Sequence, residues 1–164
     1  MKRYHLRRKD KAIRGKKAML DFLENQQTVT VALSKDDEPY LFTADYGFDR
    51  RTMSIFIHCA RKGKKIDYIT ENPVVWGQVM EDLGYVQGEC DHKYRTVQFM
   101  GKASLVTDMD EKRKALCIMI DQLEDDPIEG KREFIKGSKF KSVLIVKIKI
   151  EGLSGKESLP GDGE

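Results

Sequence analysis

Hydrophobic and polar positions alternate in six segments of the chain. Alternation with a period of two is typical of strands with one buried face. It predicts strands over residues 28–34, 40–48, 53–59, 74–80, 94–106 and 142–150. Residues 82–92 contain two glycines and indicate an irregular loop or a ragged hairpin. Six strands with short turns favour an antiparallel barrel, because closure removes exposed strand edges.

Apolar residues at helical spacing predict amphipathic helices over residues 11–26 and 111–124, with Thr107 and Asp108 as candidate caps of the second. The fold class is therefore mainly β with peripheral helices. Residues 11–153 form one predicted domain after a basic arm at residues 1–10. Residues 154–164 have no packing pattern and are expected to form a disordered tail.

Residues 54–59 form a strand in which Cys59 shares one face with Ile55 and Ile57, and His58 points to the other face. This alternation favours a core thiol over a nucleophile for Cys59. His58 is either a polar residue of a functional site or a strand histidine bonded to a neighbour. Trp76 lies in the middle of a predicted strand and is assigned to the core or to a dimer interface.

A basic turn follows this strand and leads through Gly63 into a short helix that Asn72 and Pro73 end. The first turn of that helix holds Lys64 and Lys65. Cations are unfavourable there, because the unpaired N–H groups of a helix N-terminus carry partial positive charge. A bound anion reverses the sign of this interaction. The pattern predicts a phosphate site, and a solvated basic turn is the alternative.

The charge distribution and the cysteine content narrow the possible functions and the cellular compartment. Residues 1–17 contain nine Lys or Arg and one acid, Asp10, which we interpret as a solvated arm rather than a nucleic-acid-binding segment. No apolar run approaches the roughly 20 residues of a membrane span. Three cysteines without paired spacing favour a reducing cytoplasm. Cys90, Asp91 and His92 lack the partner spacing of a zinc site, so no metal is predicted.

Several short motifs, in their order and spacing, resemble the pyridoxamine 5′-phosphate oxidase-like flavin proteins with the FMN-binding split barrel, and most closely the nitroimidazole-resistance (Nim-type) branch. The similarity runs from about residue 7 to residue 156. The motifs are Arg7-Arg8-Lys9-Asp10, Glu38-Pro39-Tyr40, Ala44-Asp45-Tyr46-Gly47-Phe48, Ile57-His58-Cys59-Ala60, Gly63-Lys64-Lys65, Glu71-Asn72-Pro73, Tyr94-Arg95-Thr96-Val97 with Gly101, and Gly155-Lys156.

The resemblance implies a split-barrel homodimer with FMN at the subunit interface. Lys64 and Lys65 would hold the phosphate, and Thr96, with Tyr94 on the same strand face, would reach the same cavity. The flavin would be lined by His58, Cys59 and Ala60, and along its ring edge by Thr43, Ala44, Asp45 and Tyr46, partly through backbone groups. The vitamin-binding arginines of the oxidase have no counterpart near the C-terminus, so pyridoxamine phosphate is not the expected substrate.

The implied activity is hydride transfer from NADH or NADPH to FMN, followed by reduction of a small acceptor such as a nitro compound, with His58 as the candidate proton donor. The alternative is a flavin or haem binder without turnover, acting in storage or sensing. His58 and His92 would then be the candidate axial ligands of haem.

Overall fold

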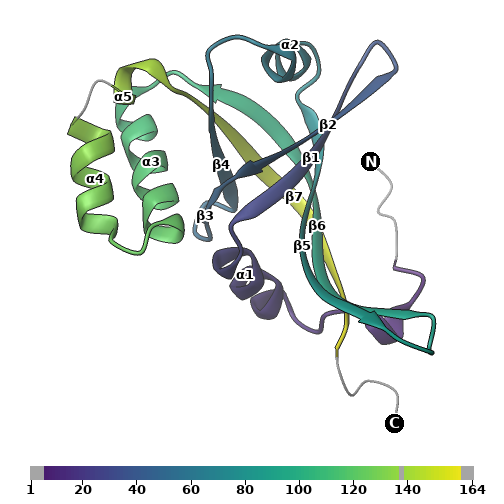
Figure 1. Cartoon of the computed structure of the whole chain (residues 1–164). Helices are drawn as coiled ribbons and strands as arrows, with labels where there is room; N and C mark the ends of the chain where they lie inside the picture. The colour runs from purple at the N-terminus through teal and green to yellow at the C-terminus, as the bar shows by residue number, and fades with distance from the viewer. Residues whose placement is uncertain (1–5, 137–138, 160–164) are drawn as a thin grey trace.

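The computed structural model describes residues 6–136 and 139–159. Seven strands form one antiparallel sheet in the order β2-β1-β5-β6-β7-β4-β3. The sheet is twisted and bent, and helices lie around it (Figure 1). The strands are β1 (Thr28–Lys35), β2 (Glu38–Asp45), β3 (Gly47–Asp49), β4 (Ser54–Cys59), β5 (Val74–Val86), β6 (Asp91–Val106) and β7 (Leu144–Ser158). The helices are η1 (Lys9–Lys11), α1 (Lys16–Asn25), α2 (Lys64–Glu71), α3 (Met109–Leu123), α4 (Pro127–Lys136) and α5 (Lys139–Ser142).

The mainly β class with peripheral helices is confirmed, but the prediction of six strands in a closed barrel is wrong. The segment predicted as one strand over residues 40–48 is split at Tyr46 into β2, which pairs with β1, and β3, which pairs with β4. The backbone N–H of Tyr46 donates to Gln27 O at 3.1 Å. This contact continues the β1–β2 register by one position, after which the chain pairs with β4 as β3, and β2 and β3 become the two edges of an open sheet.

Residues 82–92 form a ragged hairpin, which was one of the two alternatives predicted for them. β5 and β6 pair through most of residues 82–92, and the irregularity is a register shift between Asp82 and Gly84. The expected tail is wrong for residues 154–158, which continue β7 along β6 as far as the pair Tyr94 and Ser158. Residues can pair through backbone hydrogen bonds whatever their side chains are. The hydrophobic pattern therefore did not predict this part of β7. Residues 160–164 of that prediction lie outside the described residues.

The helix predictions differ from the structure mainly at their ends. α1 begins at Lys16 instead of residue 11, because Gly15 has a φ of 91° and Ala12 forms a β-bridge with Lys156. α3 matches its predicted range, and its cap is Asp108, whose side chain accepts from the Glu111 N–H. The short helix after Gly63 is α2, and it ends at Asn72 as predicted. α4 and α5 were not predicted.

Successive side chains of β4 point into two different hydrophobic clusters of the core. Ile55 and Ile57 belong to the main core between the sheet, α1 and α2, whereas Phe56 packs with Leu116 and Met119 of α3. Trp76 is 44% exposed, so its assignment to the core is wrong and its place in an interface stays a prediction. None of the helices in the described ranges combines the length and apolar character required to span a bilayer.

Candidate functional site

The N-terminus of α2 has no cap. Gly63, with a φ of 137°, occupies the cap position, so the cap residue has no side chain to bond the first turn. The carbonyl of Gly63 accepts from Ile66 N at 2.9 Å and from Asp67 N at 3.3 Å. The N–H groups of Lys64 and Lys65 have no acceptor among the described residues. Two free donors and the helix dipole therefore converge at this end.

The two lysines of this turn lie over aromatic rings of β2. Lys65 Nζ is 4.4 Å from the centroid of the Phe42 ring, and Lys64 Nζ is 5.0 Å from that of Tyr40. Lys64 also donates to Glu38 Oε1 at 3.2 Å, and this hydrogen bond raises the pKa of Lys64. Lys65 is half-buried and has no carboxylate partner in the described part of the chain. The site thus holds one neutralised cation and one unneutralised cation.

Cys59 lies at the edge of this site, half-buried against the main core. Burial raises the pKa of its thiol, and the charge of Lys65 offsets only part of that effect. The thiol is therefore protonated at neutral pH, as expected for a core thiol and not for a nucleophile. Ala60 is exposed in the loop that connects β4 to α2.

His58 is separated from Cys59 by the pleat of β4. Its side chain lines a small apolar cavity of about 170 Å³, together with Leu116, Met119 and Phe140 on the side of α3 and α5. Successive residues of a strand face opposite sides of the sheet. One ligand therefore cannot contact both side chains from one face, although the sequence placed both residues along the flavin.

The four residues at the end of β2 are likewise divided. Thr43 Oγ1 lies 2.9 Å from Thr30 Oγ1 on the outer face of the sheet, and Asp45 is exposed. Ala44 packs against the main core. Tyr46 is fully buried, and its hydroxyl donates to Leu23 O at 2.5 Å. The Tyr46 side chain is consequently a part of the core and is unavailable to a bound ligand.

Tyr94 and Thr96 lie on β6. Thr96 is buried and donates its hydroxyl to Val79 O at 3.1 Å, whereas Tyr94 is half-buried. No hydrogen bond or ion pair within residues 6–136 and 139–159 links either residue to the lysines of α2. The structure of one chain therefore gathers Lys64, Lys65 and Cys59 and leaves His58, Tyr94 and Thr96 elsewhere.

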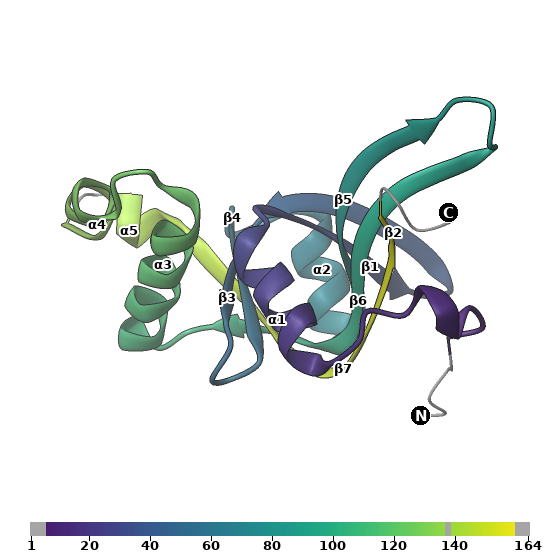
Figure 2. The same cartoon turned by 90° about the horizontal axis from the view of Figure 1, so that it is seen from below.

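The two candidate haem ligands are not close to each other. His92 lies on the β5–β6 hairpin, where its Nε2 is 2.6 Å from Asp82 Oδ1. In both views this hairpin extends away from β4, which carries His58 (Figures 1 and 2). The pair cannot provide both axial ligands of one haem within a single chain.

The sequence did not identify Glu38, Tyr40 and Phe42 as neighbours of the α2 lysines. Glu38 and Tyr40 belong to one of the motifs listed above, but their contact with α2 spans more than 20 residues of sequence. The strand period could have shown that Tyr40 and Phe42 share a face. Nothing in the sequence showed that α2 crosses this face.

The sequence model of the family described as pyridoxamine 5′-phosphate oxidase matches residues 15–157. No curated protein matches the chain. Among solved structures, a candidate 5-nitroimidazole antibiotic resistance protein from Bacteroides thetaiotaomicron is 21% identical, with a TM-score of 0.72 over 88% of this chain and 85% of that one.

Two further structures have the same fold. The FAD and heme binding protein from Mycobacterium smegmatis is 20% identical, with a TM-score of 0.74 over 93% of this chain and 77% of that one. The flavocytochrome Anf3 from Azotobacter vinelandii is 17% identical, with a TM-score of 0.77 over 98% and 76%. At these identities the likeness is one of fold.

Proposed function

Because the chain belongs to the pyridoxamine 5′-phosphate oxidase family, we propose that it is an FMN-binding flavoprotein that uses NADH or NADPH to reduce small acceptors such as nitro compounds. The observation that carries the proposal is the uncapped N-terminus of α2. Its free N–H groups and the unneutralised Lys65 have the chemistry of a phosphate site.

The residues of this turn fit the phosphate of FMN. The N–H groups of Lys64 and Lys65 would donate to its oxygens, and the ammonium groups would neutralise its charge. Lys64 would exchange Glu38 for the phosphate, because both anions compete for the same Nζ. When bound, FMN supplies the two-electron chemistry that the side chains lack.

His58 remains the residue that we propose as the proton donor to the acceptor. It is exposed at the end of β4 and lines the apolar cavity beside α3. An apolar wall beside one polar group suits a small, weakly polar acceptor. The three cysteines are free thiols, in keeping with the reducing cytoplasm that we infer.

We also propose that the protein is a homodimer that binds FMN between its subunits. The outer face of the sheet carries a row of cross-strand neighbours, Leu41, Ala32, Trp76 and Met100. Leu41 is 65% exposed and Trp76 is 44% exposed. A second copy would cover this apolar row, and it would also bring a second set of polar residues to the Thr43 side of β2.

A second candidate function is flavin or haem binding without turnover. It is favoured by the names of two structures with this fold, a FAD and heme binding protein and a flavocytochrome. Under this proposal His58 and His92 would act as haem ligands in different sites, or with residues of a second subunit.

The visible absorption spectrum of the purified protein, followed by anaerobic addition of NADH and NADPH, distinguishes these functions. We expect a two-banded flavin spectrum that bleaches with a reduced nicotinamide. A flavin spectrum that neither donor bleaches would favour the binder without turnover, and a Soret band would replace flavin with haem. A colourless protein that fails to bind added FMN would contradict both.

The phosphate assignment is tested by Lys65→Glu, with Lys102→Glu, at an exposed position of β6, as the matched control. Charge-assisted hydrogen bonds contribute roughly 1.5–3 kcal/mol, so FMN should bind about tenfold or more weakly to the first variant. Circular dichroism should show both variants folded. Equal FMN affinity of Lys65→Glu and wild type would refute the site.

A further inference from the structure

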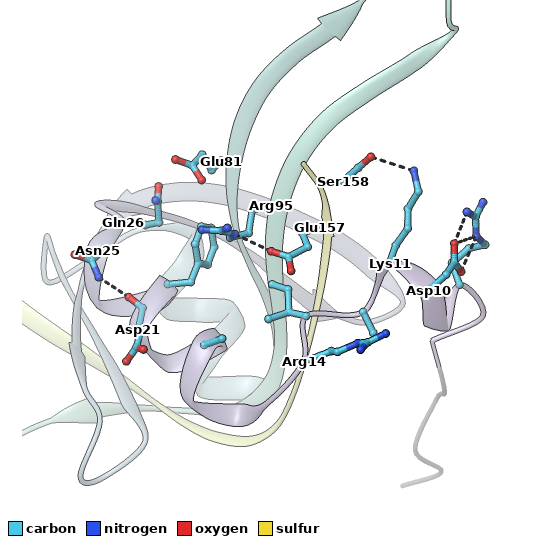
Figure 3. Close-up of a pocket in the computed structure, with 15 residues that line it drawn as sticks. Asp10, Lys11, Arg14, Asp21, Asn25, Gln26, Glu81, Arg95, Glu157 and Ser158 are labelled. Atoms are coloured by element: carbon cyan, nitrogen blue, oxygen red, sulfur yellow. Dashed lines mark hydrogen bonds and ion pairs between the residues drawn. The ribbon is translucent and has the colours of Figure 1, made fainter. Parts of the chain in front are cut away.

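A cleft of about 1080 Å³ lies at the other end of the molecule, between the N-terminal segment, α1 and one end of β5, β6 and β7 (Figure 3). None of the residues that the sequence proposed for flavin binding lines it. Arg95 lines the cleft, whereas its neighbour Thr96 faces the opposite side of β6. This cleft is therefore distinct from the candidate flavin site.

The walls of the cleft are fixed by contacts that do not depend on a ligand. Ile13 N donates to Gly155 O at 3.1 Å, and Lys11 Nζ donates to Ser158 Oγ at 3.2 Å. A Cβ on Gly155 would lie 2.8 Å from the Ile13 side chain, so glycine is needed for this close approach. The basic segment is thus held against β7, and the cleft is already formed.

Three charged residues cross the cleft in one row. Glu81 lies directly opposite Arg95 in the β5–β6 ladder, and Arg95 lies opposite Glu157 in the β6–β7 ladder. Arg95 Nε donates to Glu157 Oε2 at 3.0 Å. Within the described residues, the terminal nitrogens of Arg95 have no acceptor and half-buried Glu81 has no cation partner. One carboxylate and one donor pair therefore remain available side by side.

The apolar floor beside this row is the ring of Phe22. It is 4% exposed, and its centroid is 5.9 Å from the guanidinium carbon of Arg95. Phe22 and Glu157 hold the guanidinium in place. A planar guanidinium held in this way directs its two terminal nitrogens, as a fixed pair of donors, at one position in the cleft.

The cations of the N-terminal segment lie at the opposite side of the cleft from Glu81 (Figure 3). Arg14 is exposed and has no carboxylate partner among residues 6–136 and 139–159, and Lys11 is 3.7 Å from Asp91 Oδ1. The two sides of the cleft therefore differ in charge. An unpaired carboxylate lies at one side and an unpaired guanidinium at the other.

We propose that this cleft binds a free nucleotide whose base presents an N–H beside a carbonyl, as guanine and uracil do. The edge of the base faces the row, its N–H donates to Glu81, and its carbonyl accepts from the terminal nitrogens of Arg95 in the plane of the guanidinium. The phosphate lies toward Arg14 and Lys11. Adenine places a ring nitrogen acceptor where Glu81 requires a donor, so the site discriminates against it.

Isothermal titration calorimetry with GMP and AMP on the full-length protein as purified tests this proposal. We expect GMP to bind at least about tenfold more tightly than AMP. Glu81→Gln should weaken GMP binding by about tenfold and reduce its preference over AMP, and Glu89→Gln on the exposed hairpin turn should change neither. Arg14→Ala should weaken GMP binding several-fold and guanosine binding little, with Arg51→Ala as its control.

The proposal is overturned if neither nucleotide binds at 1 mM, or if Glu81→Gln binds GMP as wild type does. Retention of GMP binding by Lys65→Glu is the expected result, because that variant alters only the α2 site. Its loss would assign the nucleotide to α2 instead. The flavin proposal stands or falls separately, since its readout is the absorption spectrum. Thermal unfolding checks that each variant is folded.

Discussion

At the residue scale, Asp49 is a buried carboxylate that the protein keeps charged. Burial alone would raise its pKa, but hydrogen bonds from Lys114 and Thr52 outweigh burial and hold the pKa at about 2. Lys114 Nζ donates to Oδ2 at 2.8 Å, and the N–H of Arg51 donates to Oδ1 at 3.0 Å. The contacts fix the turn between β3 and β4 and attach it to α3.

Asp49→Asn should reduce the free energy of unfolding at pH 7 by about 2 kcal/mol, since a pKa lowered from 3.8 to about 2 corresponds to a stabilisation of that order. A lowered pKa stabilises the fold above the unfolded value near 4, and the stabilisation is lost as the pH falls toward 2. The difference between variant and wild type in urea unfolding should therefore shrink below pH 4. Asp37→Asn, an exposed carboxylate in the β1–β2 turn, should change stability by less than about 0.5 kcal/mol at either pH.

The proposed phosphate site predicts that Glu38 competes with FMN for Lys64. The Glu38 carboxylate accepts a hydrogen bond from Lys64 Nζ and so competes with the phosphate. Glu38→Gln should therefore strengthen FMN binding by roughly two- to fivefold, measured by fluorescence quenching of the flavin. Asp36→Asn in the same hairpin turn should leave the affinity unchanged. An unaltered affinity in Glu38→Gln would mean that Lys64 does not contact the phosphate.

At the element scale, α3 is a helix whose start is defined by a side chain. The sequence offered Thr107 and Asp108 as caps, and Asp108 Oδ1 accepts from the Glu111 N–H at 2.7 Å. α2 begins without such a cap. The start of α3 is thus closed by its own side chain, whereas the open N-terminus of α2 leaves its N–H groups free for the proposed binding of an anion.

Asp108→Ala should lower the free energy of unfolding by about 1 kcal/mol, the usual contribution of an N-cap. For a chain of this size the melting temperature should fall by about 2–4 °C in differential scanning calorimetry. Thr107→Ala, one residue earlier, should leave the melting temperature within 1–2 °C of wild type, roughly the range for exposed substitutions. An equal effect of both would contradict the assigned cap.

At the scale of the whole molecule, the open sheet leaves an apolar row on its outer face. The row consists of Leu41, Ala32, Trp76 and Met100, with exposed Met80 on the same face of β5. Exposed apolar residues that adjoin one another indicate an interaction surface more strongly than scattered ones do. This surface supports the proposed homodimer.

Trp76→Lys and Leu41→Lys should each convert the proposed dimer to a monomer at micromolar concentration, because a lysine within the covered row would bury an unpaired charge. Sedimentation velocity measures the state directly. Ile128→Lys replaces an apolar residue that is 82% exposed on α4, away from the row, and should leave the dimer intact. A wild-type protein that sediments as a monomer would refute this interface.

The sequence predicted the local features and much of the fold class. The alternation of Ile55, Phe56 and Ile57 gave the correct faces of β4, because a strand period is a local property. Asn72 and Asp108 gave one helix end and one helix start. The cations of α2 identified the turn that the structure leaves uncapped. Of the site residues carried over from the family motifs, one chain gathers Lys64, Lys65 and Cys59 and leaves the others elsewhere, and the roles of all of them stay predictions.

What the sequence determined by itself is what depends on neighbouring residues: strand faces, helix caps, and the placement of Lys64 and Lys65 in a first turn. The tertiary structure alone decided that Tyr46 splits a predicted strand, that residues 154–158 extend β7, and that Glu81, Arg95 and Glu157 meet across three strands. These outcomes depend on backbone pairing between distant segments, and backbone pairing carries little information about side-chain type. These pairings could be identified only from the folded structure.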